Sequence, residues 1–173
     1  MDPQSAFAAV ALPHLDAAYN LARWLTGSAH EAEDVVQEAM MRALTYFPSF
    51  RGENARAWVL RIVRNAAYSA LKSRAGERWL PLAEADDEAG VALVDPGDDP
   101  EAALIKARAL GRLDDLLARL PPELRETLVL RELESMSYRD IAQVTGAPIG
   151  TVMSRLWRAR RLVAQAAEKG AAP

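Results

Sequence analysis

Cysteine is absent from the 173-residue sequence, and only two histidines are present. The lack of cysteine excludes disulfides, thiol catalysis, iron–sulfur clusters and cysteine-based zinc sites. His14 and His30 have no partner at metal-ligand spacing, which argues against histidine-based acid–base catalysis. We therefore expect no metal, no cofactor and no enzymatic activity.

Aromatic residues and long apolar runs are also scarce. The chain has 4 Trp, 4 Tyr and 3 Phe against 34 Ala, which disfavours an all-β fold and favours helices. The longest uncharged run covers only the 14 residues 141–154, whereas a membrane span needs about 20. Asp2 comes before the first basic residue, Arg23, so no positive leader is visible. We expect a cytoplasmic protein without membrane insertion.

The net charge of −3 conceals an uneven distribution. Residues 51–74 carry +5 and residues 137–173 carry +4, whereas residues 75–105 carry −8. Two basic blocks thus flank an acidic one, and 18 of the 21 basic residues are Arg, which suits phosphate and base-edge contacts. Solvated helix faces would also account for such blocks.

Apolar periodicity and turn residues predict an all-α chain with two small helical domains. Helices are predicted over residues 13–26, 28–47 and 54–72, then from about 102 to 120, 123–134, 137–144 and 149–166. Between them, eight carboxylates lie from Glu84 to Glu101 without a basic residue, which indicates an extended, flexible linker. The predicted domains are residues 10–75 and 105–166, joined by residues 76–104.

The last two predicted helices and their Gly-containing turn are typical of a helix-turn-helix unit. At 100° per residue, the last helix has an apolar face of Val152, Leu156, Ala159 and Val163. The opposite face offers side chains suited to bases or phosphates in the major groove. That face consists of Thr151, Ser154, Arg155, Arg158 and Arg161, with Met153 at its edge.

Two further faces belong to the N-terminal domain. The third helix combines basic, amide and aromatic side chains, a pattern suited to unpaired bases: Arg51, Asn54, Trp58, Arg61, Asn65, Tyr68 and Lys72. Trp58 would also fit the core of the domain, and Tyr68 would also fit the boundary of that core. The second helix has a mixed, acidic face of Asp34, Gln37, Glu38 and Met41, opposite its predicted core residues Ala32, Val36, Ala39 and Ala43. This face is either solvated or a protein-docking surface.

Five segments resemble a known family. Residues 31–43 and 50–65 resemble region 2 of bacterial sigma factors, and residues 120–134, 137–142 and 150–160 resemble region 4. Having only these two regions resembles the extracytoplasmic-function class of the sigma-70 family. The resemblance covers roughly residues 10–75 and 105–165.

The resemblance implies a protein that binds core RNA polymerase and directs it to promoters. By this resemblance, the face of the second helix would bind the polymerase, the third helix and its loop would open and read the minus-10 element, and the last helix would read the minus-35 element. Met153 departs from the Lys or Arg usual in the family, which affects any contact with the minus-35 element there. An anti-sigma factor is a further implied partner, with the chain monomeric or in a 1:1 complex.

Two alternatives remain open from the sequence. A transcriptional regulator would use only the helix-turn-helix and would bind DNA tightly without polymerase. A sigma-like decoy would sequester an anti-sigma factor and would support no transcription.

Overall fold

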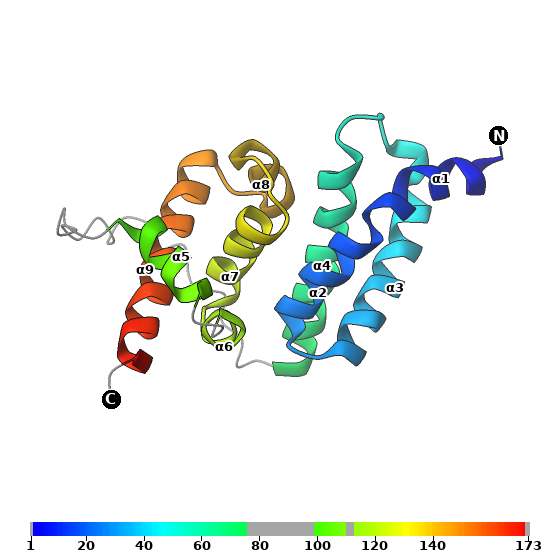
Figure 1. Ribbon diagram of the computed structural model, residues 1–173. Helices are drawn as coiled ribbons and strands as arrows, with labels where there is room; N and C mark the ends of the chain where they lie inside the picture. Colours follow the sequence, from blue (N-terminus) through cyan, green and yellow to red (C-terminus); the bar gives the residue numbers. More distant parts are fainter. Residues whose placement is uncertain (1, 76–98, 110–112, 172–173) are drawn as a thin grey trace.

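The computed structural model describes residues 2–75, 99–109 and 113–171. Within these ranges the secondary structure is helical and contains no strand. Figure 1 shows the helices in two neighbouring groups, one from each half of the chain. The prediction of an all-α chain with two helical domains is confirmed. The predicted linker comprises residues 76–104, of which residues 76–98 lie outside the described residues. Its last residues, from Pro100, already belong to a helix.

The N-terminal group packs α2, α3 and α4 against one another. Its elements are α1 (Pro3–Ala11), the 3₁₀ turn η1 (Leu12–His14), α2 (Leu15–Thr26), α3 (Ala29–Tyr46), the 3₁₀ turn η2 (Phe47–Ser49) and α4 (Ala55–Ala75). Gly27 ends α2 with a positive φ of 74°, and the Ser28 hydroxyl then accepts from the Glu31 amide to begin α3. Many buried positions here are alanine, which lets the three helices approach closely.

The C-terminal group surrounds α9. Its elements are α5 (Pro100–Ala109), α6 (Leu113–Ala118), α7 (Pro122–Leu128), the π-helical turn η5 (Val129–Leu133), α8 (Tyr138–Thr145) and α9 (Ile149–Ala171). Ser137 begins α8 by accepting from the Asp140 amide, and Gly146 ends it with a positive φ of 73°. The predicted helix-turn-helix unit is thus formed by α8 and α9.

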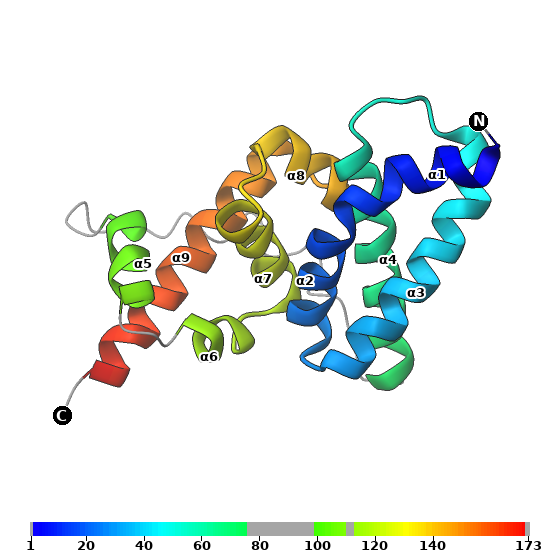
Figure 2. The same cartoon turned by 45° about the vertical axis from the view of Figure 1, so that its right-hand side comes forward.

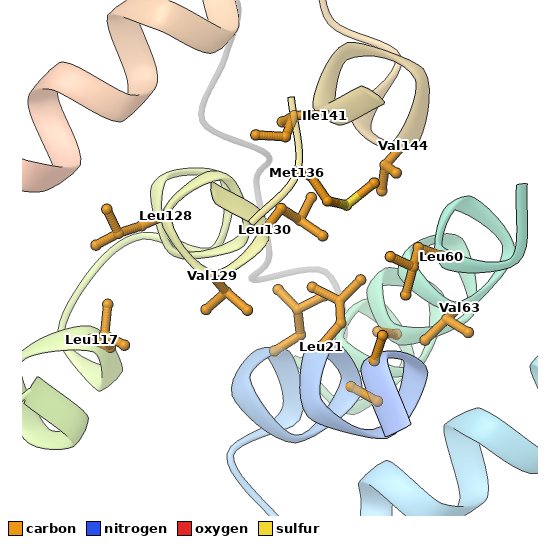
Figure 3. Packing of buried hydrophobic residues seen from close by; sticks show 14 of the residues in the cluster. Leu21, Leu60, Val63, Leu117, Leu128, Val129, Leu130, Met136, Ile141 and Val144 are labelled. Atoms are coloured by element: carbon orange, nitrogen blue, oxygen red, sulfur yellow. The ribbon is translucent and has the colours of Figure 1, made fainter. Parts of the chain in front are cut away.

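One hydrophobic core runs through both groups. α7 and α8 pack against α2 and α4, so that α7 lies beside α2 in both ribbon views (Figures 1 and 2). At the junction, Val129 and Leu130 face Leu21 of α2, and Leu60 of α4 lies near Met136 (Figure 3). These five side chains are at most 2% exposed. The two domains therefore share buried apolar surface.

The structure departs from the predicted elements at several places. The helix predicted from about 102 to 120 is described as two, α5 up to Ala109 and α6 from Leu113 to Ala118. α1 was not predicted, and it begins where the Asp2 carboxylate accepts from the amides of Gln4 and Ser5. On α3, Val35 takes the buried position expected for Val36, which is half-buried. The helix predicted over 123–134 is an α-helix only to Leu128 and continues as a π-helical turn.

Candidate nucleic-acid and polymerase interfaces

α9 has the two faces that its periodicity predicts. Val152, Leu156, Ala159 and Val163 are all buried. On the other side Met153 is 52% exposed and Ser154 is exposed, while Thr151, Arg155, Arg158 and Arg161 are half-buried. The apolar back holds the helix on the domain and leaves small polar and cationic groups at the surface.

The arginines of α9 differ in what they contact. Arg160 donates from Nε and Nη2 to Glu132 Oε1, at 3.0 and 2.6 Å, and both side chains are largely buried. The Arg161 guanidinium lies 5.2 Å from the centre of the Trp157 ring. Arg160 therefore has a structural role in the C-terminal domain, whereas Arg158 belongs to the outward face.

The loop before α4 is fixed by its backbone and by an aromatic cluster. Gly52 and Asn54 have positive φ values of 81° and 42°. The Asn54 side-chain oxygen accepts from the Ala57 amide at 3.2 Å and so caps α4, which leaves its amide nitrogen to donate elsewhere. The Trp58 ring packs on Phe50, with centroids 4.7 Å apart, and next to Phe47. Trp58 thus supports the loop from a half-buried position.

The predicted stripe on α4 is partly exposed and partly covered. Arg51, Arg61, Asn65 and Lys72 are exposed. Tyr68 is not on the open surface, because its ring lies beneath Arg64, with the guanidinium carbon 4.2 Å from the ring centre. Burial and the nearby Glu126 raise the pKa of the Tyr68 hydroxyl far above its usual value. Of the positions that the sequence left open for Tyr68, the structure supports a largely covered one beneath Arg64.

The sequence did not predict the polar contacts that join the two domains. Arg64 of α4 forms a fork on Glu126 of α7, with Nε to Oε2 at 2.9 Å and Nη2 to Oε1 at 3.2 Å. The Asn54 amide donates to Asp140 at 2.7 Å and to Gln143 at 3.0 Å, both on α8.

A second carboxylate joins three elements. Glu134 accepts from the Asn20 amide of α2 at 2.6 Å and from Arg56 Nη2 of α4 at 2.7 Å. Nearby, Arg125 donates to the Trp24 carbonyl at 2.9 Å. The junction therefore combines an apolar centre with charged hydrogen bonds around it.

Burial dominates the electrostatics of the Arg64–Glu126 pair. Glu126 is 0% exposed, and this burial raises the pKa of its carboxyl, while the hydrogen bonds and charge of Arg64 oppose the rise. Burial by itself lowers the pKa of Arg64, but Glu126 outweighs it and the net shift is upward. Arg64 is thus the main group that favours the charged form of the buried Glu126 carboxyl, with Arg155 and the Tyr68 hydroxyl acting in the same direction.

The outer face of α3 is open and mixed in character. Asp34, Gln37, Glu38 and Met41 are all exposed, Met41 by 68%. Leu44 and Tyr46 extend this surface with apolar area. The structure therefore places all four residues predicted for a protein-docking face together on one side of α3.

Metal-binding clusters and membrane-spanning helices are both absent from the described part of the chain. Across residues 2–75, 99–109 and 113–171 it holds no group of three or more His, Asp or Glu arranged to bind a metal ion. None of the helices described is both long and apolar enough to cross a bilayer.

Family models match both halves of the chain. The model described as "Sigma-70 region 2" matches residues 11–77, and that described as "Sigma-70, region 4" matches residues 110–163. The RNA polymerase sigma-H factor of Pseudomonas aeruginosa is 38% identical over 143 residues, which cover 80% of this chain and 74% of that protein. The ECF RNA polymerase sigma-E factor of Haemophilus influenzae is 37% identical over 141 residues, covering 79% and 74%.

Two solved structures resemble the whole arrangement. The sigma factor RpoE of Bartonella quintana, solved with the anti-sigma factor NepR, matches with a TM-score of 0.66 and 30% identity over 96% of this chain and 99% of that one. CnrH, solved with the cytosolic domain of CnrY, matches with a TM-score of 0.65 and 25% identity over 98% and 91%.

Proposed function

This chain belongs to the sigma-70 family of RNA polymerase sigma factors, in its extracytoplasmic-function class, and we propose how its surfaces divide the work of initiation. It binds core polymerase through α3, opens and reads the minus-10 element with the 50–54 loop and α4, and reads the minus-35 element with α9. The observation that carries this division is that the three surfaces differ in chemistry: one mixed and acidic, one basic with amides, one arginine-faced.

The minus-35 contact is assigned to α9 as the recognition helix of a helix-turn-helix unit. Its buried apolar face seats it on the domain, so the opposite face is available to the major groove. Arg158 is the side chain assigned to a guanine or phosphate contact, with Thr151, Ser154, Arg155 and Arg161 around it. Met153 would place a thioether where a cation is usual, which favours an apolar contact such as a thymine methyl group.

The minus-10 contact is assigned to the capped loop and the open side of α4. The amide nitrogen of Asn54 is a hydrogen-bond donor suited to an acceptor on a base edge. Arg51, Arg61 and Lys72 would hold phosphates of the opened strand, and Asn65 and Trp58 would contact bases. A structural role for Trp58 in the aromatic cluster is compatible with this, because the ring is half-buried.

The polymerase contact is assigned to Asp34, Gln37, Glu38 and Met41 of α3. Charged and apolar groups lie side by side there, as at protein interfaces, and no core packing is lost when they change. An anti-sigma factor is a second proposed partner, since a similar sigma factor was solved with the anti-sigma factor NepR bound. The proposed site of action is the cytoplasm, with the chain monomeric or in a 1:1 complex.

Run-off transcription from a genomic library, with core polymerase and with or without this protein, tests the function. New start sites that depend on the protein are expected. Tight, specific DNA binding without polymerase and no new transcripts would instead favour a regulator. Binding to an anti-sigma factor with no transcription from any template would favour a decoy.

A matched pair of variants tests the polymerase surface. Asp34→Arg reverses a charge on the proposed face and is expected to weaken retention of core polymerase in a pull-down. Asp16→Arg reverses the same charge at an exposed position of α2, outside the proposed face, so it is the control and should retain the polymerase. Equal retention by both variants would mean that this face of α3 is only solvated.

A further inference from the structure

A cavity of about 470 Å³ lies between α2, α6 and α7. Its volume falls within the range of about 300–1,000 Å³ that is usual for small-molecule sites. The polar and aromatic side chains that line it are Asn20, Arg23 and Trp24 of α2, Asp115 of α6 and Arg125 of α7. These residues belong neither to the polymerase face nor to the two surfaces assigned to promoter DNA. The cavity is therefore a feature that initiation leaves unexplained.

Arg125 gives the cavity a fixed positive charge. Its guanidinium donates to four backbone carbonyls at 2.7–2.9 Å, those of Leu117, Trp24, Ala118 and Leu120. An arginine has five N–H donors, so one on Nη1 is left over. The ion pairs formed among the described residues do not include Arg125, and burial lowers the pKa of its guanidinium. An anion in the cavity would supply the countercharge that the carbonyls do not.

α2 adds a second cation and a flat ring. Arg23 is exposed, and it too forms no ion pair within the described part of the chain. Trp24, the next residue, is half-buried and offers the aromatic surface on which a second ring can stack. Asp115 of α6 is exposed and accepts hydrogen bonds only, whereas the Asn20 side chain donates its amide to Glu134 and keeps an oxygen for a further donor.

We propose that this cavity binds a nucleoside monophosphate. The phosphate pairs with Arg23 and Arg125, the base lies against Trp24, and the ribose hydroxyls donate to Asp115. Inorganic phosphate alone would meet Asp115 as a like charge and would leave the ring of Trp24 unused, so the nucleoside part is needed for affinity. The proposal does not depend on the surfaces assigned to polymerase or to promoter DNA.

Calorimetric titration of the full-length protein with each of the four ribonucleoside monophosphates tests the site. We expect saturable binding of one nucleotide per chain, tightest for the two purines because their larger bases cover more of the Trp24 ring. Inorganic phosphate and adenosine each carry half of the recognised chemistry and are expected to bind at least roughly tenfold more weakly than adenosine monophosphate. Since the walls come from both domains, the nucleotide should also raise the melting temperature of the protein.

Two arginine variants separate this site from general attraction of anions. Arg23→Gln removes an exposed cation of the cavity without disturbing the core, and is expected to weaken adenosine monophosphate binding by roughly tenfold. Arg119→Gln is the matched control, because Arg119 is also exposed but does not line the cavity, and it should leave the dissociation constant unchanged.

Three results would overturn the proposal: no saturable binding of any of the four nucleotides, equal weakening by Arg23→Gln and Arg119→Gln, or inorganic phosphate binding as tightly as adenosine monophosphate. The titrations contain neither polymerase nor DNA. Their outcome is therefore separate from the run-off assay, which tests initiation itself.

Discussion

α4 and α9 have similar sequence patterns but different places in the fold. Each has an apolar stripe opposite a basic, polar one, yet α9 packs mainly against helices of its own domain, whereas α4 packs against both its own domain and α8. On α9 the polar face is left outward. On α4 the C-terminal domain takes Arg64 and Tyr68 into the junction and engages Asn54. A helix pattern thus predicts a binding face only where the helix packs against its own domain alone.

The largest expected effect comes from removing the centre of the junction. Arg64→Met would leave the Glu126 carboxylate buried without its partner, at a cost of about 3–5 kcal/mol in the closed state, in which the two domains pack together. The domains should therefore separate, which is measured by energy transfer between dyes attached at Ala29→Cys and Gln165→Cys, two exposed positions in a chain that has no other cysteine.

The double variant Arg64→Met with Glu126→Leu is the control for this change. Replacing both charges with apolar side chains removes the unpaired carboxylate, so closure should return. Persistent closure in the single variant would show that the buried pair does not hold α4 against α7.

On α9, Arg158→Ala is expected to weaken promoter binding by about 1–3 kcal/mol if the side chain holds a base edge. If it holds a phosphate, binding should fall equally on all sequences and the salt slope should decrease by about 0.9. Holoenzyme binding to matched and mismatched minus-35 duplexes at several salt concentrations separates the two cases.

Arg160→Ala is the matched control for Arg158→Ala. It should lower the melting temperature, because it leaves Glu132 without its ion pair, and should keep the minus-35 sequence preference. Unchanged binding by Arg158→Ala at every salt concentration would remove Arg158 from the site.

Asn54→Asp tests whether the contacts of Asn54 with α8 set α4 apart from α9. The substitution keeps an acceptor for the Ala57 amide, so α4 keeps its cap, but it removes the donor and faces Asp140 with a like charge. We expect closure to weaken by about 1–3 kcal/mol and minus-10-dependent run-off to fall. Retained closure together with full run-off would contradict both roles of Asn54.

The smallest expected effect concerns His14. Burial and the charge of Arg56 lower the pKa of this histidine, so the folded protein binds its proton less readily than the unfolded chain. Stability should be fully present above pH about 6.5 and should decrease as the pH falls through the lowered pKa. Unfolding midpoints of the wild type and of His14→Gln from pH 7 to pH 5 check this, since the variant should lose that component.

The sequence was enough to predict most of the helices but not the contacts between them. Ser28, Gly27, Ser137 and Gly146 marked helix ends by local chemistry, which does not depend on the rest of the fold. The apolar face of α9 followed from its period. α1 was missed because its helical stretch carries little patterning and begins at a single cap, Asp2.

The junction could not be predicted because its partners lie far apart in the chain. Arg64 and Glu126 are 62 positions apart, and Asn54 and Gln143 are 89 apart. Their separate local patterns are those of ordinary exposed polar residues on amphipathic helices. Only the packing of α7 and α8 on α4 turns them into a buried pair and a tether.

The π-helical turn Val129–Leu133 sets the rotation of Glu134 about the helix axis, and so its position relative to Asn20 and Arg56. The Glu134 amide donates to the Val129 carbonyl, five residues back, at 3.1 Å. If the turn tightened to an ordinary α-helix without losing a residue, Glu134 would advance by about 100° around the axis and about 1.5 Å along it. The carboxylate would then turn away from Asn20 and Arg56. The contact of Glu134 with α2 and α4 therefore depends on one extra residue in this turn.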